Sequence, residues 1–100
     1  MDCEIVWTDR ASADLRRVFD YISEHNPTAA DSLIQAILDR VELLQTVPRM
    51  GRHYTTRNEQ EIRQVVSGKY RIFYAIVPTG NRVEILTIWH SARQEPDLSE

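Results

Sequence analysis

The stretch NPTAADSLIQAILDRVELL, Asn26–Leu44, decides which fold this sequence adopts. Pro27 suits the first turn of a helix, and Asn26 before it offers a side-chain oxygen as the cap. Apolar residues then recur at helical spacing and form one continuous stripe, made of Ala30, Leu33, Ile34, Ile37, Leu38, Val41 and Leu44. The stretch therefore predicts an amphipathic helix that packs one face against a core.

A second amphipathic helix precedes this one. Thr8 offers an N-cap hydroxyl, and Asp9 adds a negative charge to the first turn. The apolar positions that follow at helical spacing are Ala11, Leu15, Val18, Phe19 and Ile22. The helix breaks at His25–Pro27, because proline cannot continue it. Two helices joined by a tight break predict an antiparallel helical hairpin.

The residues on either side of this hairpin have strand character. Short runs rich in β-branched and aromatic residues predict strands at residues 2–7, 61–67, 69–77 and 82–90. Ser67–Gly68 and Pro78–Asn81 have the composition of tight turns, so we expect the last three strands to form an antiparallel meander. Residues 48–60 are polar and show no period, which predicts a loop.

The predicted order is β-α-α-β-β-β, an α+β fold in which the hairpin packs on one face of an antiparallel sheet. The place of the first strand, at an edge or in the centre of the sheet, stays open. We expect a single domain over residues 1–100, since a chain of this length suffices for one core.

Several features of the sequence favour a cytoplasmic protein. No run approaches the ~18 apolar residues of a membrane span, and the start MDCEIVW lacks the pattern of a secretion signal. The lone Cys3 has no partner for an internal disulfide, which fits a reducing compartment.

Charge is distributed unevenly along the chain. Residues 1–47 carry four basic and nine acidic side chains, a net charge of −5, whereas residues 48–93 carry eight basic and three acidic ones, a net charge of +5. The second half thus offers a positive surface to an anionic partner, although chance segregation of solvated charges explains the same numbers. The whole chain has a net charge of −3, which is not the basic character of a nucleic-acid binder.

Basic and aromatic residues are the candidates for chemistry. No metal-binding spacing, phosphate-binding glycine loop or nucleophile motif occurs in the sequence, so we expect neither a metal nor another cofactor. If the strands align them, Arg71, His90 and Arg93 form a set for metal-independent phosphodiester cleavage, because arginines stabilise the charged phosphorane and a histidine moves a proton.

A structural interpretation of the same residues is open as well. Arg71 and Arg63 would then pair with Glu61 or Glu84 across the sheet, and His90 would only close the core. Trp89 is expected to pack in the core or to face a partner.

The sequence also resembles a known family. The hairpin ADLRRVFDYISEHNPTAADSLIQAILDRVELLQTVPRMGR is similar to the helical half of the RelE/ParE toxins of bacterial type II toxin–antitoxin pairs. The segments IRQVVSGKYRIFYAIV and VEILTIWHSAR resemble their sheet half, so that the resemblance spans roughly Ile5–Arg93. Its most specific elements, in order, are Leu44, Pro48, Gly51, Arg63, Tyr70, Arg71, Tyr74, His90 and Arg93.

The resemblance implies one of two activities. RelE-like members cleave messenger RNA on the ribosome with several Lys and Arg residues and a C-terminal Tyr, whereas ParE-like members lack that set and inhibit DNA gyrase, which halts replication. Arg71 matches the strand arginine of the family, but the preceding strand offers Arg63 alone beside Glu61, and no Tyr follows Arg93.

These departures and the acidic composition favour the ParE branch, with gyrase as a target that is bound rather than a substrate that is cleaved. The alternative is a RelE-like endoribonuclease that uses Arg71, His90 and Arg93. A third possibility is a non-toxic member that only binds its antitoxin.

The resemblance further implies a partner, an acidic antitoxin with a DNA-binding N-terminal region, in a toxin–antitoxin hetero-oligomer. The antitoxin of the family wraps a helical or extended segment over the sheet and helices of the toxin. We expect this groove to be lined by Val65, Tyr74, Leu86 or Trp89. For antitoxin and target together, the expected contact residues are Arg63, Tyr74, Trp89, His90 and Arg93.

Overall fold

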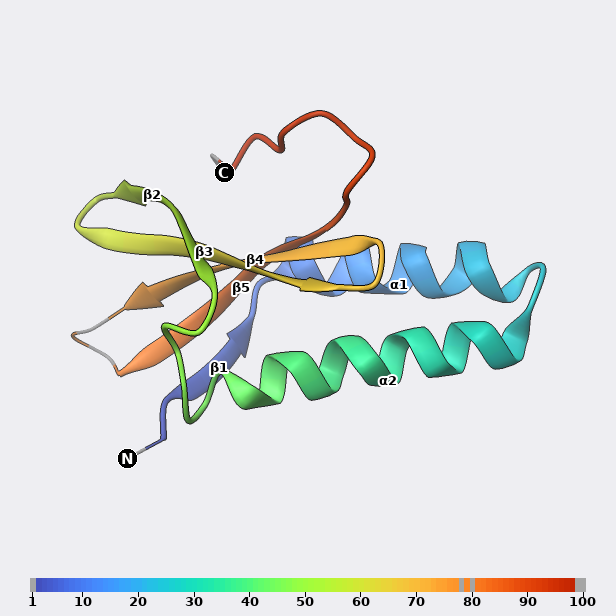
Figure 1. Ribbon diagram of the computed structural model, residues 1–100, viewed down its shortest axis with the longest axis horizontal. Coiled ribbons are helices and arrows are strands. Elements are labelled where there is room, and N and C mark those ends of the chain that lie inside the picture. Colours follow the sequence, from blue (N-terminus) through green and yellow to red (C-terminus); the bar gives the residue numbers. More distant parts are fainter. Residues whose placement is uncertain (1, 78, 80, 99–100) are drawn as a thin grey trace.

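A computed structural model describes residues 2–77, 79 and 81–98 of the chain. Its elements are β1 (Glu4–Trp7), α1 (Asp9–Ser23), α2 (Pro27–Leu43), β2 (Arg52–Arg57), β3 (Gln60–Ser67), β4 (Tyr70–Val77) and β5 (Arg82–His90), as Figure 1 shows. The strands form one five-stranded sheet in the order β1-β5-β4-β3-β2. The predicted α+β fold, with a helical hairpin packed on one face of a sheet, is confirmed.

The predicted loop at residues 48–60 is wrong in part, because it contains β2. The order therefore reads β-α-α-β-β-β-β, one strand more than predicted. β2 is an edge strand with exposed or half-buried side chains, so its sequence RHYTTR has no apolar alternation that would reveal it. A register irregularity between His53 and Thr55 further interrupts its period.

β1 takes the opposite edge of the sheet and pairs with β5 in parallel. The sheet is therefore mixed, whereas we expected it to be antiparallel throughout. The predicted meander of the last three strands is confirmed, because β3, β4 and β5 pair in antiparallel fashion. Gly68 makes the first link with a positive φ of 59°. The second predicted turn, Pro78–Asn81, contains residues 78 and 80, which lie outside the described part of the chain.

Both predicted helix caps are present. The Thr8 hydroxyl accepts the Ala11 N–H at 3.1 Å and donates to the Ile85 carbonyl at 2.7 Å, so it joins the start of α1 to β5. The Asn26 side chain accepts the Ala29 N–H at 3.1 Å, with Pro27 in the first turn of α2. Within the described residues, neither helix combines the length and apolar character that crossing a membrane requires.

The core lies between the hairpin and the sheet. Its fully buried members include Ile37 on α2, Leu44 directly after α2, and Ile72 and Tyr74 on β4. Leu38, which the sequence placed in the apolar stripe of α2, is instead 39% exposed. The stripe is narrower than predicted because only one side of α2 faces the sheet.

The face of the sheet that points away from the helices is also covered. On β4, Phe73, Ala75 and Val77 point to this second face and are buried. The C-terminal segment Gln94–Leu98, which we call the strap, runs over this side, while α2 lies on the other (Figure 1). Pro96 of the strap is buried. The strand β4 is therefore enclosed between the hairpin and the chain's own end.

A buried hydroxyl ties the segment after α2 to the sheet. The Tyr74 hydroxyl donates to the Pro48 carbonyl at 2.7 Å and accepts the Gly51 N–H at 3.0 Å. The contact requires glycine, because a Cβ at Gly51 would lie 2.6 Å from both the Tyr74 hydroxyl oxygen and the Gln64 carbonyl oxygen. The hydroxyl of Tyr74 thus contacts both Pro48 and Gly51, which accounts for the spacing of these two residues in the sequence.

We predict that Tyr74→Phe lowers the free energy of unfolding by about 1–3 kcal/mol, because it leaves a buried backbone N–H and a partly buried carbonyl without their partner. Urea denaturation followed by circular dichroism measures the change. The matched control is Tyr21→Phe, whose side chain is exposed, and it should change stability by less than about 0.5 kcal/mol. Equal stability of the two variants would contradict the role given to the Tyr74 hydroxyl.

Candidate functional site

The last strand ends with two side chains on opposite faces of the sheet. His90 pairs with Tyr70 in register, and its ring meets the Tyr70 ring edge-on with centroids 5.1 Å apart. The His90 Nδ1 accepts the Ala92 N–H at 3.0 Å. Trp89 pairs in register with Arg71 and points to the second face. The end of β5 therefore contributes to two separate surfaces.

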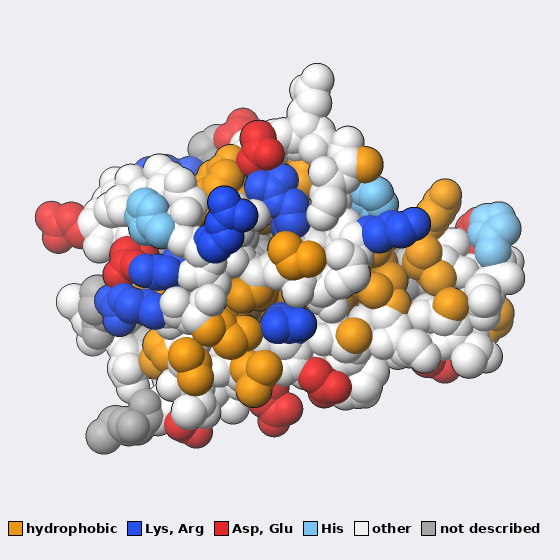
Figure 2. All heavy atoms as spheres, in the orientation of Figure 1, with side chains coloured by type: hydrophobic (Ala, Val, Ile, Leu, Met, Phe, Trp, Pro, Cys, Tyr) orange, Lys and Arg blue, Asp and Glu red, His pale blue; other side chains and the backbone are white. Residues whose placement is uncertain are grey.

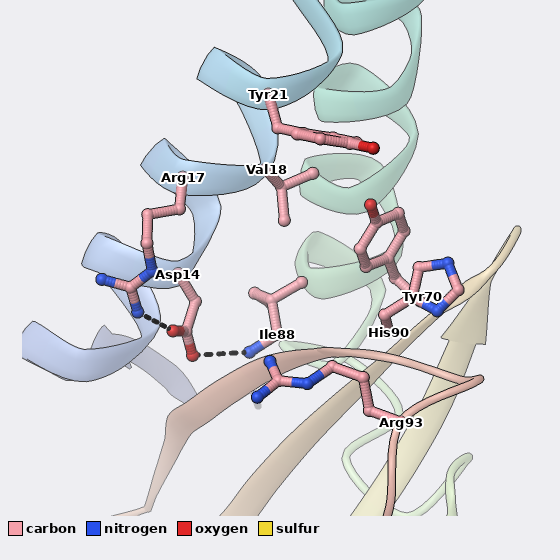
Figure 3. Close-up of a pocket in the computed structure, with 8 residues that line it drawn as sticks. All are labelled: Asp14, Arg17, Val18, Tyr21, Tyr70, Ile88, His90 and Arg93. Atoms are coloured by element: carbon pink, nitrogen blue, oxygen red, sulfur yellow. Dashed lines mark hydrogen bonds and ion pairs between the residues drawn. The ribbon is translucent and has the colours of Figure 1, made fainter.

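A groove opens on the helix side, between α1 and the ends of β4 and β5 (Figure 3). It encloses about 450 Å³ and is lined by Asp14, Arg17, Val18, Tyr21, Tyr70, Ile88, His90 and Arg93. A second depression shares Tyr21, Tyr70 and His90 with the first and continues to Lys69 and α2. Tyr21 is 66% exposed at the junction of the two. Together they form one groove with apolar walls and a mainly cationic rim.

The acidic residue of this groove has a structural role. β1 pairs with residues 82–85 of β5, and beyond them Asp14 of α1 covers the strand edge. The Asp14 carboxylate accepts the Thr87 hydroxyl and the Ile88 N–H, the latter at 3.3 Å, and pairs with Arg17. Because these contacts occupy the Asp14 carboxylate, Arg93 and Lys69 give the rim of the groove a positive character.

On the second face, Arg71 forms a two-pronged ion pair with the strap. Its two terminal nitrogens donate to the Glu95 carboxylate at 3.1 and 3.0 Å, and its Nε donates to the Gln64 side chain at 2.8 Å. The guanidinium also lies 4.8 Å from the centre of the Phe73 ring. The Arg71 side chain is only 14% exposed. This arginine is therefore occupied and nearly buried.

Tyr54 of β2 completes this arrangement. Its hydroxyl donates to Glu95 at 3.0 Å, and its ring packs edge-on against Phe73 with centroids 4.9 Å apart. Hydrogen bonds from Arg71 and then from Tyr54 hold the pKa of the Glu95 carboxyl below its usual range. Burial, followed by the hydrogen bond to Glu95, raises the pKa of the Tyr54 hydroxyl, so it stays protonated and donates at neutral pH.

Arg93 and Trp89 lie at the rim between the two faces. The Arg93 guanidinium lies 3.9 Å from the centre of the Trp89 ring, a cation–π contact. The Trp89 indole N–H donates to the Gln94 carbonyl at 2.7 Å. Trp89 thus holds the first residue of the strap, while the Arg93 side chain also lines the groove of Figure 3.

Arg63 is held by the structure around it. Its guanidinium pairs with Glu61 at 2.8 Å and donates to the Gly51 carbonyl at 2.6 Å. The same Glu61 pairs with Arg49, and the Arg63 side chain is 18% exposed. Arg63 does pair with Glu61, as predicted, but the two residues lie on the same strand β3 and the pair does not cross the sheet. The predicted alternatives for Arg71 are wrong, because Arg71 pairs with Glu95 and Glu84 pairs with Arg82.

The set predicted for phosphodiester cleavage is not brought together. Arg71 lies on the second face under the strap, whereas His90 lies on the helix side against Tyr70, and Arg93 stands at the rim between them. In the described part of the chain, no group of three His, Cys, Asp or Glu side chains is placed to hold a metal ion.

The residues expected to line a partner groove fall into a buried group and a partly exposed group. Val65 and Tyr74 are buried in the core, so the expectation that they contact a partner is contradicted. Trp89 and Leu86 are half-buried, and His90 and Arg93 line the groove. Figure 2 shows Lys and Arg side chains across the middle of the face it presents, with most acidic side chains toward its margins.

Sequence reasoning counted Tyr54 among the basic and aromatic candidates only as a residue of the predicted loop, and it missed Glu95 and Pro96 as parts of a site. The sequence contained one signal, since Pro96 follows an acidic residue and Leu98 supplies an apolar one near the end of the chain. This signal is weak, because it acquires meaning only when β4 and β2 place Arg71 and Tyr54 beside it.

Comparison with known proteins gives a consistent family. The model described as the ParE toxin of the type II toxin–antitoxin system, parDE, matches residues 5–95. Toxin RelE2 of Caulobacter vibrioides is 34% identical over 90 residues, which cover 90% of this chain and 97% of that protein.

Two solved structures share the fold. The chromosomal ParDE toxin–antitoxin system from P. aeruginosa has a TM-score of 0.72 at 23% identity and covers 88% of this chain and 95% of its own. The archaeal RelE–RelB complex from Pyrococcus horikoshii has a TM-score of 0.68 at 16% identity and covers 94% of this chain and 100% of its own.

We predict that the ion pair of Glu95 with Arg71 makes the protein less stable as the pH is lowered into the acidic range. The folded-state pKa of Glu95 is lowered, so its contribution is fully present above the unfolded pKa of about 4.3 and is lost as the pH falls through the lowered value. Wild type should therefore be more stable than Glu95→Gln at pH 7, and the gap should narrow as the pH falls through the lowered pKa of Glu95.

Urea midpoints of the two proteins between pH 7 and pH 2.5 measure this gap. Glu42→Gln, an exposed position on α2, serves as the matched control and should show no such convergence. A wild-type advantage that stays constant down to pH 2.5 would speak against the pair.

Proposed function

The chain belongs to the ParE toxin family of type II toxin–antitoxin systems, and from this premise we propose that it inhibits DNA gyrase by binding it. Binding of gyrase stops replication, and a cognate antitoxin neutralises the toxin in the cytoplasm. In this proposal the chain is not an enzyme.

The position of Arg71 carries the proposal. Metal-independent cleavage of RNA requires a cation on the phosphate and a proton-transfer group within reach of the same atoms. Here the Arg71 guanidinium is neutralised by Glu95 and lies on the face opposite His90. The arrangement therefore supports binding over cleavage. The overall net charge of −3 points the same way, since affinity for RNA is built from many cationic contacts.

We assign the antitoxin to the groove on the helix side. An amphipathic segment would place apolar side chains against Tyr21, Val18 and Ile88 and acidic ones toward Arg93 and Lys69. The structures with the same fold include a toxin–antitoxin system and a RelE–RelB complex, which agrees with a partner of this kind. We expect His90 and Arg93 to contact the antitoxin or the target.

We predict that Tyr21→Ala weakens binding of the antitoxin at least tenfold, because an exposed tyrosine in an apolar groove has the character of a binding hot spot. Isothermal titration calorimetry with the cognate antitoxin measures the loss. Leu43→Ala removes a comparably exposed apolar side chain that is not part of the groove, and it should change affinity less than twofold. Equal losses of affinity in the two variants would contradict the assignment of the antitoxin to this groove.

Expression without the antitoxin separates the candidate activities. We predict filamentous cells and a DNA-damage response while protein synthesis continues. Rapid arrest of protein synthesis with cut transcripts would instead favour the RelE-like endoribonuclease, and in that case Arg71→Ala should abolish cleavage. Growth without any defect, from a chain shown to be folded and abundant, would favour a member that only binds its antitoxin.

A further inference from the structure

The helical hairpin has a second groove, on the flank of α1 that does not face the strands. This outer groove is a hollow of about 440 Å³, and its lining residues all belong to the two helices: Ser12, Leu15, Arg16, Phe19 and Asp20 of α1 and Ile34 of α2. The groove of Figure 3 uses the other flank of α1, with Asp14, Arg17 and Tyr21. The function proposed above does not use the outer groove.

The lining of the outer groove is mainly apolar, because each helix carries more apolar residues than the core covers. Leu15 and Phe19 lie one turn apart on α1 and are half-buried, as is Ile34 on α2. Leu38 follows Ile34 by one turn on the same side of α2 and is 39% exposed. Each helix thus offers an apolar row with i, i+4 spacing, the kind of ridge that packs into the groove of another helix pair.

Charged side chains on α1 border these apolar rows. The side chains of Arg16 and Asp20 are 82% and 64% exposed, and their nearest charged atoms are 4.0 Å apart, so both are open to a second partner. Val18 is midway between them in the sequence. If an identical α1 crosses the first in antiparallel fashion at the level of Val18, Arg16 of each copy lies beside Asp20 of the other. A two-fold axis at this point therefore makes the border self-complementary.

We propose that the outer groove is the contact between two copies of this chain, which form a two-fold symmetric dimer through their helical hairpins. The apolar rows supply the affinity, whereas Arg16 and Asp20 supply the register, because exposed ion pairs add little stability but like charges placed together oppose association. The side chains that pack in the middle of the contact are Leu15, Phe19, Ile34 and Leu38 of each copy. This inference does not depend on gyrase being the target.

The dimer leaves the other surfaces accessible. The groove of Figure 3 lies on the opposite flank of α1, and the strap lies on the far face of the sheet. Each copy therefore keeps the groove that we assign to the antitoxin, and one dimer binds two antitoxins. Because a two-fold contact uses the same surface on both copies, association stops at two chains.

Sedimentation velocity of the purified full-length chain tests for the dimer. The average mass should rise with concentration from that of one chain to that of two over about 1 to 500 µM, as mass action requires. We expect a dissociation constant on the order of 10 µM, since a contact between two pairs of short helices is at the small end of the range for protein interfaces.

Two leucines of α2 provide a matched pair of substitutions. Leu38→Asp places a charge in the middle of the contact and should weaken dimerisation by about tenfold or more. Leu43 is 53% exposed, but it lies five positions further along the helix and so points to a different side. Leu43→Asp should therefore change the dissociation constant less than about twofold. Circular dichroism checks that both variants are folded.

Reversal of single charges tests the register. The Arg16→Glu chain has two acidic residues at the border and the Asp20→Arg chain has two basic ones, so each alone should dimerise about tenfold more weakly than wild type. An equimolar mixture sets the acidic border against the basic one and should form a heterodimer about as readily as wild type forms its dimer. Native mass spectrometry identifies the heterodimer, because the two variants differ in mass. A change in the stability of either chain alone cannot produce recovery on mixing.

Three results would overturn the proposal: a chain that stays monomeric over the whole concentration range, equal losses in the Leu38→Asp and Leu43→Asp variants, and absence of the heterodimer from the mixture. A monomeric wild-type chain whose inhibition of gyrase is abolished by Leu38→Asp would also overturn it, since the outer groove would then bind the target.

Discussion

The rest of this molecule depends on the two-residue alternation of β4, a strand that is buried on both faces. Tyr70, Ile72 and Tyr74 point to the helices, while Arg71, Phe73 and Ala75 point to the strap. Because Tyr70 and Arg71 are neighbours in sequence, they must lie on opposite sides. The adjacent residues Tyr70 and Arg71 thus contribute to two different surfaces.

The residues of β4 that face the helices stabilise the packing of the helical hairpin on the sheet. Tyr74 ties the segment after α2 to the sheet, and Asp14 of α1 closes the part of β5 that β1 does not reach. These polar contacts are local, and the buried apolar side chains of α2 and β4 supply the area that stabilises the fold. The same packing leaves Tyr21 exposed at the groove that we assign to the antitoxin.

Sequence reasoning recovered the elements whose residues carry a period. The stripe of α2, the caps Thr8 and Asn26 and the meander from β3 to β5 were all predictable, because helices and half-buried strands impose spacing on their own residues. β2 was not predictable, since a polar edge strand has no such spacing. β2 forms by pairing with the edge of β3, and the sequence does not show that this edge is available.

The site was harder to predict than the fold for a related reason. Arg71 and His90 were recognised as residues of interest, yet only the register of β4 with β5 shows that they face apart. Glu95 lies outside every regular element, so its pairing with Arg71, 24 residues earlier, follows from the path of the strap alone. Long-range pairs of this kind leave no local pattern.

The two surfaces together support our proposal that the protein binds its target and does not cleave RNA. The helix-side groove offers apolar walls and a cationic rim, and the second face holds a carboxylate against an arginine that a nuclease would need free. A supercoiling assay with purified DNA gyrase, ATP and relaxed plasmid tests this claim most directly. Addition of the purified toxin should block supercoiling, and the cognate antitoxin should restore it. Undiminished supercoiling at a large molar excess of toxin, together with cleavage of messenger RNA on purified ribosomes, would contradict it.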